Sequence, residues 1–213
     1  MKKLLGIICV MFLVLALAMP LSCTKKEEKE TTKEEKTREK EADESETGSG
    51  EEEGETEFEV TSSAFGNDAD IPVKYAHSDI NGGENVSIPL EWENPPDGTK
   101  SFAISMVDTH EIAGNFLHWL VINIDPDTTS IEEGASGTNM PSGATEFNND
   151  YGEEGYGGPN PPPDSGEHDY EITVYALSIP SMGMTENAGL DEFKSFTEGK
   201  VLGEAVISGE FSQ

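Results

Sequence analysis

The chain has 213 residues, which is enough for one or two domains. Its 43 acidic and 13 basic residues give a formal net charge of -30, and this charge excludes a nucleic-acid-binding protein, which must meet the phosphate backbone with clustered Lys and Arg. The only two cysteines, Cys9 and Cys23, precede the rest of the chain, so no disulfide framework and no Cys-based metal site can exist downstream of them.

Residues 1–22 have the pattern of a secretory signal peptide. Two lysines precede an apolar run of 16 residues, Leu4 to Met19, which is shorter than the roughly 20 residues that a membrane-spanning helix needs. The following Pro20-Leu21-Ser22-Cys23 resembles a lipobox, in which the Cys is acylated and becomes the mature N-terminus, although Pro20 stands where an aliphatic residue is expected. We predict lipidation of Cys23 and an extracytoplasmic, membrane-anchored lipoprotein. The alternative is cleavage after Ala16-Leu17-Ala18, which releases a soluble secreted protein.

Residues 23–57 form a low-complexity segment. From residue 24 onward it has 15 acidic residues, 7 basic residues and no large apolar residue. Such a segment cannot bury enough surface to offset its ordering entropy. We predict an acidic, disordered tether that holds the next domain away from a membrane. The alternative is a solvated leader segment without a specific function.

Residues 58–213 are predicted to form one folded domain. This segment has 4 basic and 28 acidic residues, which gives 4 - 28 = -24. A charge this high repels itself in dilute buffer, and its even spread favours adaptation to high salt, where screening is strong. The alternative is an acidic face that binds cations or a basic partner.

Apolar residues recur with a period of two, which is typical of β-strands. Short runs of this kind, separated by Gly, Pro and Asn, predict an all-β fold, an antiparallel β-sandwich with one or two short helices. The one helical pattern is Asp191 to Glu198. The inward rows are predicted to be Phe102, Ile104, Met106 and Asp108; His118, Leu120, Ile122 and Ile124; and His168, Tyr170, Ile172, Val174 and Ala176, with shorter strands at Phe58 to Ser62, Pro89 to Trp92 and Val201 to Ile207.

Polar residues stand at the ends of these apolar rows. Asp108 ends one row, His118 begins the next, and His168 and Tyr170 begin a third. If the strands are antiparallel neighbours, these ends meet at one edge of the core. A buried polar group without a partner costs roughly 1 to 3 kcal/mol, so we expect the four residues to cluster around a binding pocket. The alternative is that each is a satisfied structural side chain.

A long loop precedes His168. Tyr151 to Glu167 is rich in Gly and Pro and includes Gly155-Tyr156-Gly157-Gly158-Pro159-Asn160-Pro161-Pro162-Pro163. Glycines allow backbone to approach a ligand with exposed N–H groups, and prolines stiffen a loop. The loop is therefore predicted to cover the pocket; the alternative is a plain surface loop.

These residues together resemble the phosphatidylethanolamine-binding protein family, in its prokaryotic Raf-kinase-inhibitor-like (YbhB/YbcL-type) branch. The resemblance covers nearly all of residues 58–213. It implies a β-sandwich with a small pocket for phosphate, phospholipid headgroups or similar anions. The segments that carry it are Phe58 to Ala64, Ile71-Pro72, Gly83 to Ser87, Leu90-Glu91-Trp92, Lys100-Ser101-Phe102, His118-Trp119, Gly155 to Pro163 and His168 to Leu177. The ligand-binding residues that it implies are Asp108, His118, Gly158, Pro159, His168 and Tyr170.

The chain departs from the family pattern at two positions. The family usually has Asp-Pro-Asp where this chain has Asp108-Thr109-His110, and His-Arg-Tyr where it has His168-Asp169-Tyr170. We expect His110 and Asp169 to be neighbours that have exchanged charge. Loss of the Arg and the charge of -24 predict weak anion binding that improves from low to moderate salt.

Three classes of function remain open. The first is a binding protein for a small anionic ligand, attached to a membrane by its lipid anchor. The second is an inhibitor or regulator of a secreted protease or another protein partner. The third is an enzyme that uses Asp108, His118 and His168 as metal ligands or as acid and base. The chain has no Gly-x-Ser-x-Gly or His-Glu-x-x-His motif, so we favour a binding protein without catalytic residues, metal or cofactor. The sequence does not determine whether the domain forms a homodimer.

Overall fold

The computed structural model describes residues 56–185 and 188–213. The predicted signal peptide, Cys23 and nearly all of the predicted tether lie outside these residues. No helix in the described ranges is long and apolar enough to cross a membrane. The elements are β1 (Glu59–Thr61), β2 (Ala69–Asp70), the 3-10 helix η1 (Val73–Tyr75), β3 (Leu90–Glu93), β4 (Ser101–Asp108), β5 (Phe116–Ile124), β6 (Ser130–Ile131), β7 (Thr145–Glu146), β8 (His168–Leu177), α1 (Leu190–Thr197) and β9 (Val201–Phe211).

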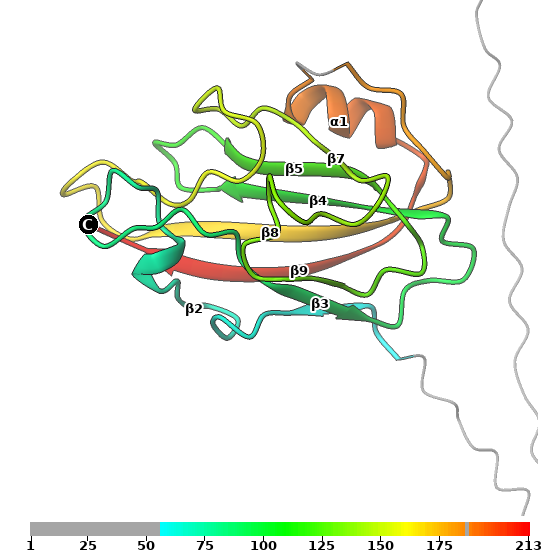
Figure 1. Ribbon diagram of the computed structural model, residues 1–213, viewed down its shortest axis with the longest axis horizontal. Helices are drawn as coiled ribbons and strands as arrows, with labels where there is room; N and C mark the ends of the chain where they lie inside the picture. The colour runs from blue at the N-terminus through cyan, green and yellow to red at the C-terminus, as the bar shows by residue number, and fades with distance from the viewer. Residues whose placement is uncertain (1–55, 186–187) are drawn as a thin grey trace, which may run out of the picture. The chain divides into compact units, whose positions relative to one another are not determined.

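The described domain is built from two β-sheets (Figure 1). Three strands form the smaller sheet, in the order β1-β3-β6, and six form the larger one, in the order β2-β9-β8-β4-β5-β7. All neighbours are antiparallel except the short pair of β2 with β9. The structure therefore confirms the predicted all-β fold with few helices, and it adds the two-residue strands β2, β6 and β7.

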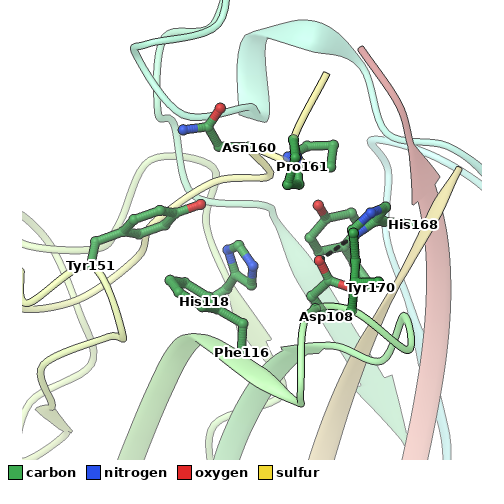
Figure 2. Close-up of a pocket in the computed structure, with 11 residues that line it drawn as sticks. Asp108, Phe116, His118, Tyr151, Asn160, Pro161, His168 and Tyr170 are labelled. Carbon is green, nitrogen blue, oxygen red and sulfur yellow. Dashed lines mark hydrogen bonds and ion pairs between the residues drawn. The ribbon is translucent and has the colours of Figure 1, made fainter. Parts of the chain in front are cut away.

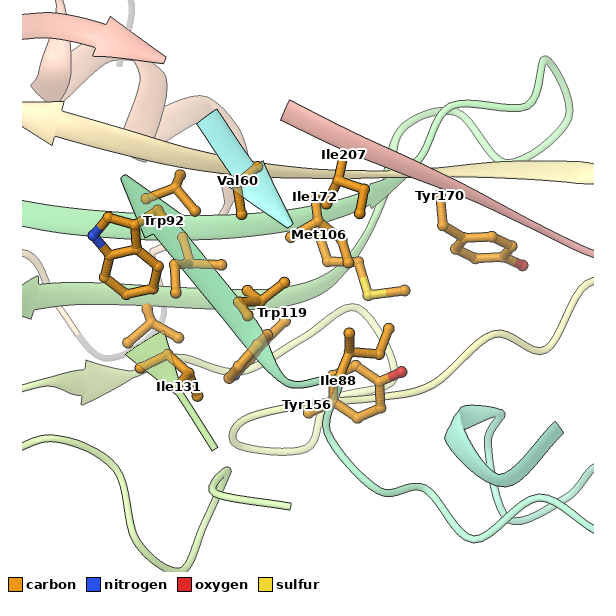
Figure 3. Packing of buried hydrophobic residues seen from close by; sticks show 14 of the residues in the cluster. Val60, Ile88, Trp92, Met106, Trp119, Ile131, Tyr156, Tyr170, Ile172 and Ile207 are labelled. Carbon is orange, nitrogen blue, oxygen red and sulfur yellow. The ribbon is translucent and has the colours of Figure 1, made fainter. Parts of the chain in front are cut away.

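The main core lies between the two sheets. Trp92 of β3 packs edge-on against Phe102 of β4, with ring centroids 5.4 Å apart. Figure 3 shows Trp92 at one end of this core and Tyr170 at the other, with Met106 and Ile172 between them. The inward rows predicted for β4 and β8 are confirmed. The polar residues that begin or end these rows therefore lie at one end of the core.

A second cluster covers the outer face of the large sheet. Phe193 of α1 is fully buried and packs against the Tyr175 ring at 5.1 Å. Because both faces of the central strands are covered, all eight residues of β4 are buried. The large sheet is thus a rigid frame that holds side chains on both sides.

Two irregularities in β5 overturn part of the predicted row. The pairing changes from Met106–Trp119 to Val107–Leu117, so His118 is an extra residue on β5, and a second shift lies near Asn123, whose φ is 60°. A β-bulge of this kind moves the following side chains to the other face. As a result Trp119 faces the main core, whereas Leu120 and Ile122 lie in the outer cluster. The prediction that Leu120 and Ile122 share the face of His118 was wrong.

Candidate functional site

The register of the large sheet brings four polar residues together. Asp108, the last residue of β4, lies opposite Phe116 of β5 and Tyr170 of β8. His118 follows two residues after Phe116, and His168 begins β8. Their exposed fractions are 4% for Asp108, 2% for His118, 1% for His168 and 0% for Tyr170. The predicted convergence of these strand ends is present in the structure.

The four residues line a cavity of about 220 Å³ (Figure 2). Gly158 and Pro159, which the resemblance also implied, do not line it; the next residues of the same loop do. The remaining lining residues are Ile112, Ala113, Phe116, Tyr151, Asn160, Pro161 and Pro162. Tyr151 and residues 160–162 belong to the loop that the sequence singled out, but Ile112, Ala113 and Phe116 carried no chemical signal and were missed.

Asp108 and His168 form the tightest contact in the site. Asp108 Oδ2 lies 2.6 Å from His168 Nδ1, and Asp108 Oδ1 accepts a hydrogen bond from the His110 backbone N–H at 2.9 Å. Ser165 donates its hydroxyl to the Pro162 carbonyl, so its oxygen is left to accept from His168 Nε2 at 2.9 Å. Both nitrogens of His168 thus face oxygen atoms of the protein, and these two contacts fix the ring in the cavity wall.

His118 is held in one tautomer. Its Nδ1 lies 2.7 Å from the carbonyl oxygen of Gly157, which can only accept, so Nδ1 carries the proton. Burial lowers the pKa of His118 to about 4, against the smaller raising effects of Gly157 and Asp108. The ring is therefore neutral at pH 7, and its Nε2 is a hydrogen-bond acceptor. Neutral His118 therefore cannot donate a hydrogen bond to an anion from Nε2.

Tyr170 has a buried hydroxyl without a partner. Among the described residues, only the Tyr170 hydroxyl and Trp92 Nε1 are buried side-chain polar atoms with no hydrogen bond. Trp92 belongs to the core, whereas Tyr170 lines the cavity. Burial and the nearby Asp108 carboxylate raise the pKa of Tyr170 well above 10, so its hydroxyl keeps its proton. Figure 2 shows this hydroxyl pointing toward the Pro161 side of the cavity.

The glycines of the loop serve packing within the protein. The N–H of Gly157 donates to the His118 carbonyl at 2.8 Å, and that of Gly158 donates to Asn85 Oδ1 at 2.7 Å. A Cβ on Gly158 would lie 2.1 Å from the Tyr75 carbonyl oxygen. The prediction that these glycines offer free N–H groups to a ligand was wrong, because the protein itself uses them.

His110 lies at the site in an unexpected way. Its ring stacks on His168, with centroids 3.9 Å apart. The backbones are neighbours, since the Thr109 N–H donates to the Asp169 carbonyl at 2.9 Å. This contact agrees with the expectation that His110 and Asp169 are neighbours, although no ion pair joins their side chains, both of which the structure describes. The His77 ring packs at a tilt against Tyr151, with centroids 4.7 Å apart, so all four histidines of the chain lie around this cavity.

The geometry gives no support to the metal-site alternative. In the ranges that the structure describes, the one group of three side chains placed to share a metal ion is Asp70, Glu167 and Glu210, on the surface beside β2 and β9. Asp108 and His168 instead bond to each other, and His118 bonds to Gly157. The arrangement can bind and orient a small polar ligand through Tyr170 and His118.

Comparisons with known proteins agree with this architecture. The family model described as phosphatidylethanolamine-binding protein matches residues 61–212. The UPF0098 protein of Aquifex aeolicus is 36% identical over 155 residues, which are 73% of this chain and 88% of that protein. A Mycobacterium tuberculosis protein named "Putative lipoprotein LppC" is 33% identical over 120 residues, 56% of this chain and 55% of that protein.

A solved structure gives the same result. The crystal structure of Escherichia coli YbcL has a TM-score of 0.70 and 29% sequence identity, and the match covers 74% of this chain and 99% of YbcL. One family accounts for the matched length, for the sheet order and for the strand ends that meet at one cavity. The chain belongs to the phosphatidylethanolamine-binding protein family, in its YbhB/YbcL-type branch.

Proposed function

We propose that this protein binds a small phosphate-bearing anion in the cavity between Asp108, His118, His168 and Tyr170. The observation that carries the proposal is the unpartnered, buried hydroxyl of Tyr170, which lines the cavity. Leaving such a group unpaired costs roughly 1 to 3 kcal/mol, and a ligand oxygen removes that penalty. Asn160 also lines the cavity, although Figure 2 shows its amide pointing away from Tyr170 and His118.

The size of the cavity limits the ligand. About 220 Å³ lies below the roughly 300 to 1,000 Å³ typical of drug-sized ligands, so the cavity suits a single phosphate-sized group. Phe116 and the prolines 161 and 162 supply apolar walls that strengthen polar contacts by excluding water. A phospholipid would place only part of its headgroup here.

The protein is proposed to be a binding protein and not an enzyme. Asp108 already accepts two hydrogen bonds from the protein, and His168 faces an acceptor at each nitrogen. Because the hydrogen bonds of Asp108 and His168 hold the cavity wall in place, these side chains are not free to act as acid or base. This supports a rigid binding site. We propose that the protein is located at the outer face of a membrane, to which lipidated Cys23 attaches it by way of the acidic tether. The name of the M. tuberculosis relative, "Putative lipoprotein LppC", supports this location.

Titration calorimetry with inorganic phosphate and with phosphoethanolamine tests the proposal. Wild-type protein is expected to bind, and Tyr170→Phe to bind roughly tenfold more weakly because one hydrogen bond to a charged ligand is lost. Tyr156→Phe is the matched control. Its hydroxyl donates to the Tyr75 carbonyl outside the cavity, so it should leave affinity unchanged. Absence of binding in wild type, or equal loss in both variants, contradicts the proposed pocket.

A further inference from the structure

Only one ring nitrogen of His118, Nε2, is available to a ligand. Its Nδ1–H is committed to the Gly157 carbonyl, and Gly157 in turn donates its N–H to the His118 carbonyl. These two bonds fix the ring on the bulge of β5, where it lines the cavity, and they leave Nε2 as the ring nitrogen that they do not use. A neutral ring therefore presents a lone pair, which repels a ligand oxygen that carries only lone pairs and attracts one that carries a proton.

The surrounding charges favour the same ligand form. The groups that face His118 are Asp108 from β4, Tyr170 and His168 from β8, and Tyr151 and Asp150 from the loop after β7. His110 lies behind His168, and His77 lies behind Tyr151. No Lys or Arg lines the cavity. The cavity lining therefore contains no side chain of fixed positive charge that could neutralise a second negative charge on a ligand.

We propose that the pocket selects a phosphate monoester that retains one proton, with that hydroxyl donating to His118 Nε2, and that it discriminates against phosphodiesters. This inference rests on the proposed function and narrows it to one class of ligand. A diester has no proton to donate at neutral pH, so it binds only if His118 itself becomes charged. The phosphate of a phospholipid such as phosphatidylethanolamine is a diester, and this places such lipids among the disfavoured ligands.

The size of the discrimination follows from the two protonation steps. A phosphate monoester has its second pKa near about 6, whereas the buried His118 has a pKa of about 4. Protonating the monoester is therefore easier than protonating His118 by roughly two pH units, which corresponds to about a hundredfold in affinity. Above about pH 6, monoester binding takes up one proton, so affinity should fall about tenfold for each pH unit.

Methyl phosphate and dimethyl phosphate are the sharpest pair of probes, because they differ by one methyl group. Calorimetry at pH 7.5, in two buffers of different ionisation enthalpy, gives affinity and proton uptake together. We expect methyl phosphate to bind at least tenfold more tightly than dimethyl phosphate, with close to one proton taken up. Glycerophosphoethanolamine represents the lipid headgroup and should behave like the diester.

The variant His118→Gln removes the titratable acceptor. Its amide offers N–H donors as well as a carbonyl acceptor, so it can hold a ligand oxygen that carries no proton. Proton uptake should therefore fall toward zero and the preference for the monoester should disappear. Nitrogen-15 NMR of His118 in the wild-type protein is independent of any variant and should show protonated Nδ1 and unprotonated Nε2 at pH 7. Equal affinity for the two methyl phosphates, or binding without proton uptake, overturns the inference while the proposed function stands. Failure of every phosphate probe to bind overturns both.

Discussion

At the scale of a single residue, the buried hydroxyl of Tyr170 is expected to lower stability when no ligand is bound. The ring belongs to the main core, yet its hydroxyl is buried without a partner. A phenylalanine fills the same space and avoids that penalty. In phosphate-free buffer we therefore expect Tyr170→Phe to raise the free energy of unfolding by about 1 kcal/mol, as measured by urea denaturation.

Tyr156 provides the contrast to this prediction. It is a buried tyrosine whose hydroxyl donates to the Tyr75 carbonyl at 2.9 Å. Its replacement by Phe removes a satisfied hydrogen bond, so the free energy of unfolding should fall by about 1 kcal/mol. If Tyr170→Phe lowers stability as much as Tyr156→Phe does, the Tyr170 hydroxyl has a partner in the folded protein and its ligand-binding role loses its basis.

Two elements position the site, the bulged strand β5 and the glycine-containing loop beside it. The bulge turns His118 toward the cavity while Trp119 remains in the core. The loop then closes on the segment after η1, where Gly158 lies against the backbone of Tyr75, Ala76 and His77. The side chain of Asn85, whose φ is 54°, holds the loop in this position by accepting a hydrogen bond from the Gly158 N–H.

Gly158→Ala tests this element. Its Cβ would lie 2.1 Å from the Tyr75 carbonyl oxygen and 2.7 Å from the His77 nitrogen, and backbone atoms must shift to admit it. We expect a loss of about 2 kcal/mol or more in the free energy of unfolding, with weaker phosphate binding because the loop is displaced.

Gly66→Ala is the control for that substitution. A Cβ at Gly66 meets no atom within 4 Å, so stability should change by less than about 0.5 kcal/mol. A Gly158→Ala protein as stable as Gly66→Ala would show that the loop does not need the close approach.

At the scale of the whole domain, acidic residues face one another directly. Glu59 lies opposite Glu93 across β1 and β3, and Asp169 lies opposite Glu210 across β8 and β9. Glu167 is close enough to Glu210 to raise the pKa of that carboxyl. Like charges directly opposite each other in a sheet are destabilising. The folded segment therefore carries repulsion that salt screens.

Salt should strengthen phosphate binding for the same reason. The screening length falls from about 30 Å at 0.01 M to about 8 Å at 0.15 M, which reduces the repulsion between a domain of charge -24 and an anion. We expect the dissociation constant for phosphate to decrease between these two concentrations of sodium chloride, as followed by calorimetry. Sodium fluoride at equal ionic strength controls for chloride competing in the pocket. Weaker binding at the higher concentration contradicts the prediction.

The sequence alone determined the four long strands of the large sheet and the face on which Asp108, His168 and Tyr170 lie, because a period of two in side-chain polarity depends only on local backbone geometry. It did not determine the bulges of β5, since inserting one residue leaves composition and hydrophobicity nearly unchanged while reversing the faces of Leu120 and Ile122. Nor did it identify Asn160 and Pro161 as cavity residues in place of Gly158 and Pro159. Which atoms of a loop face a cavity depends on contacts with distant segments, here Asn85 and Tyr75, and only the tertiary structure brings those segments together.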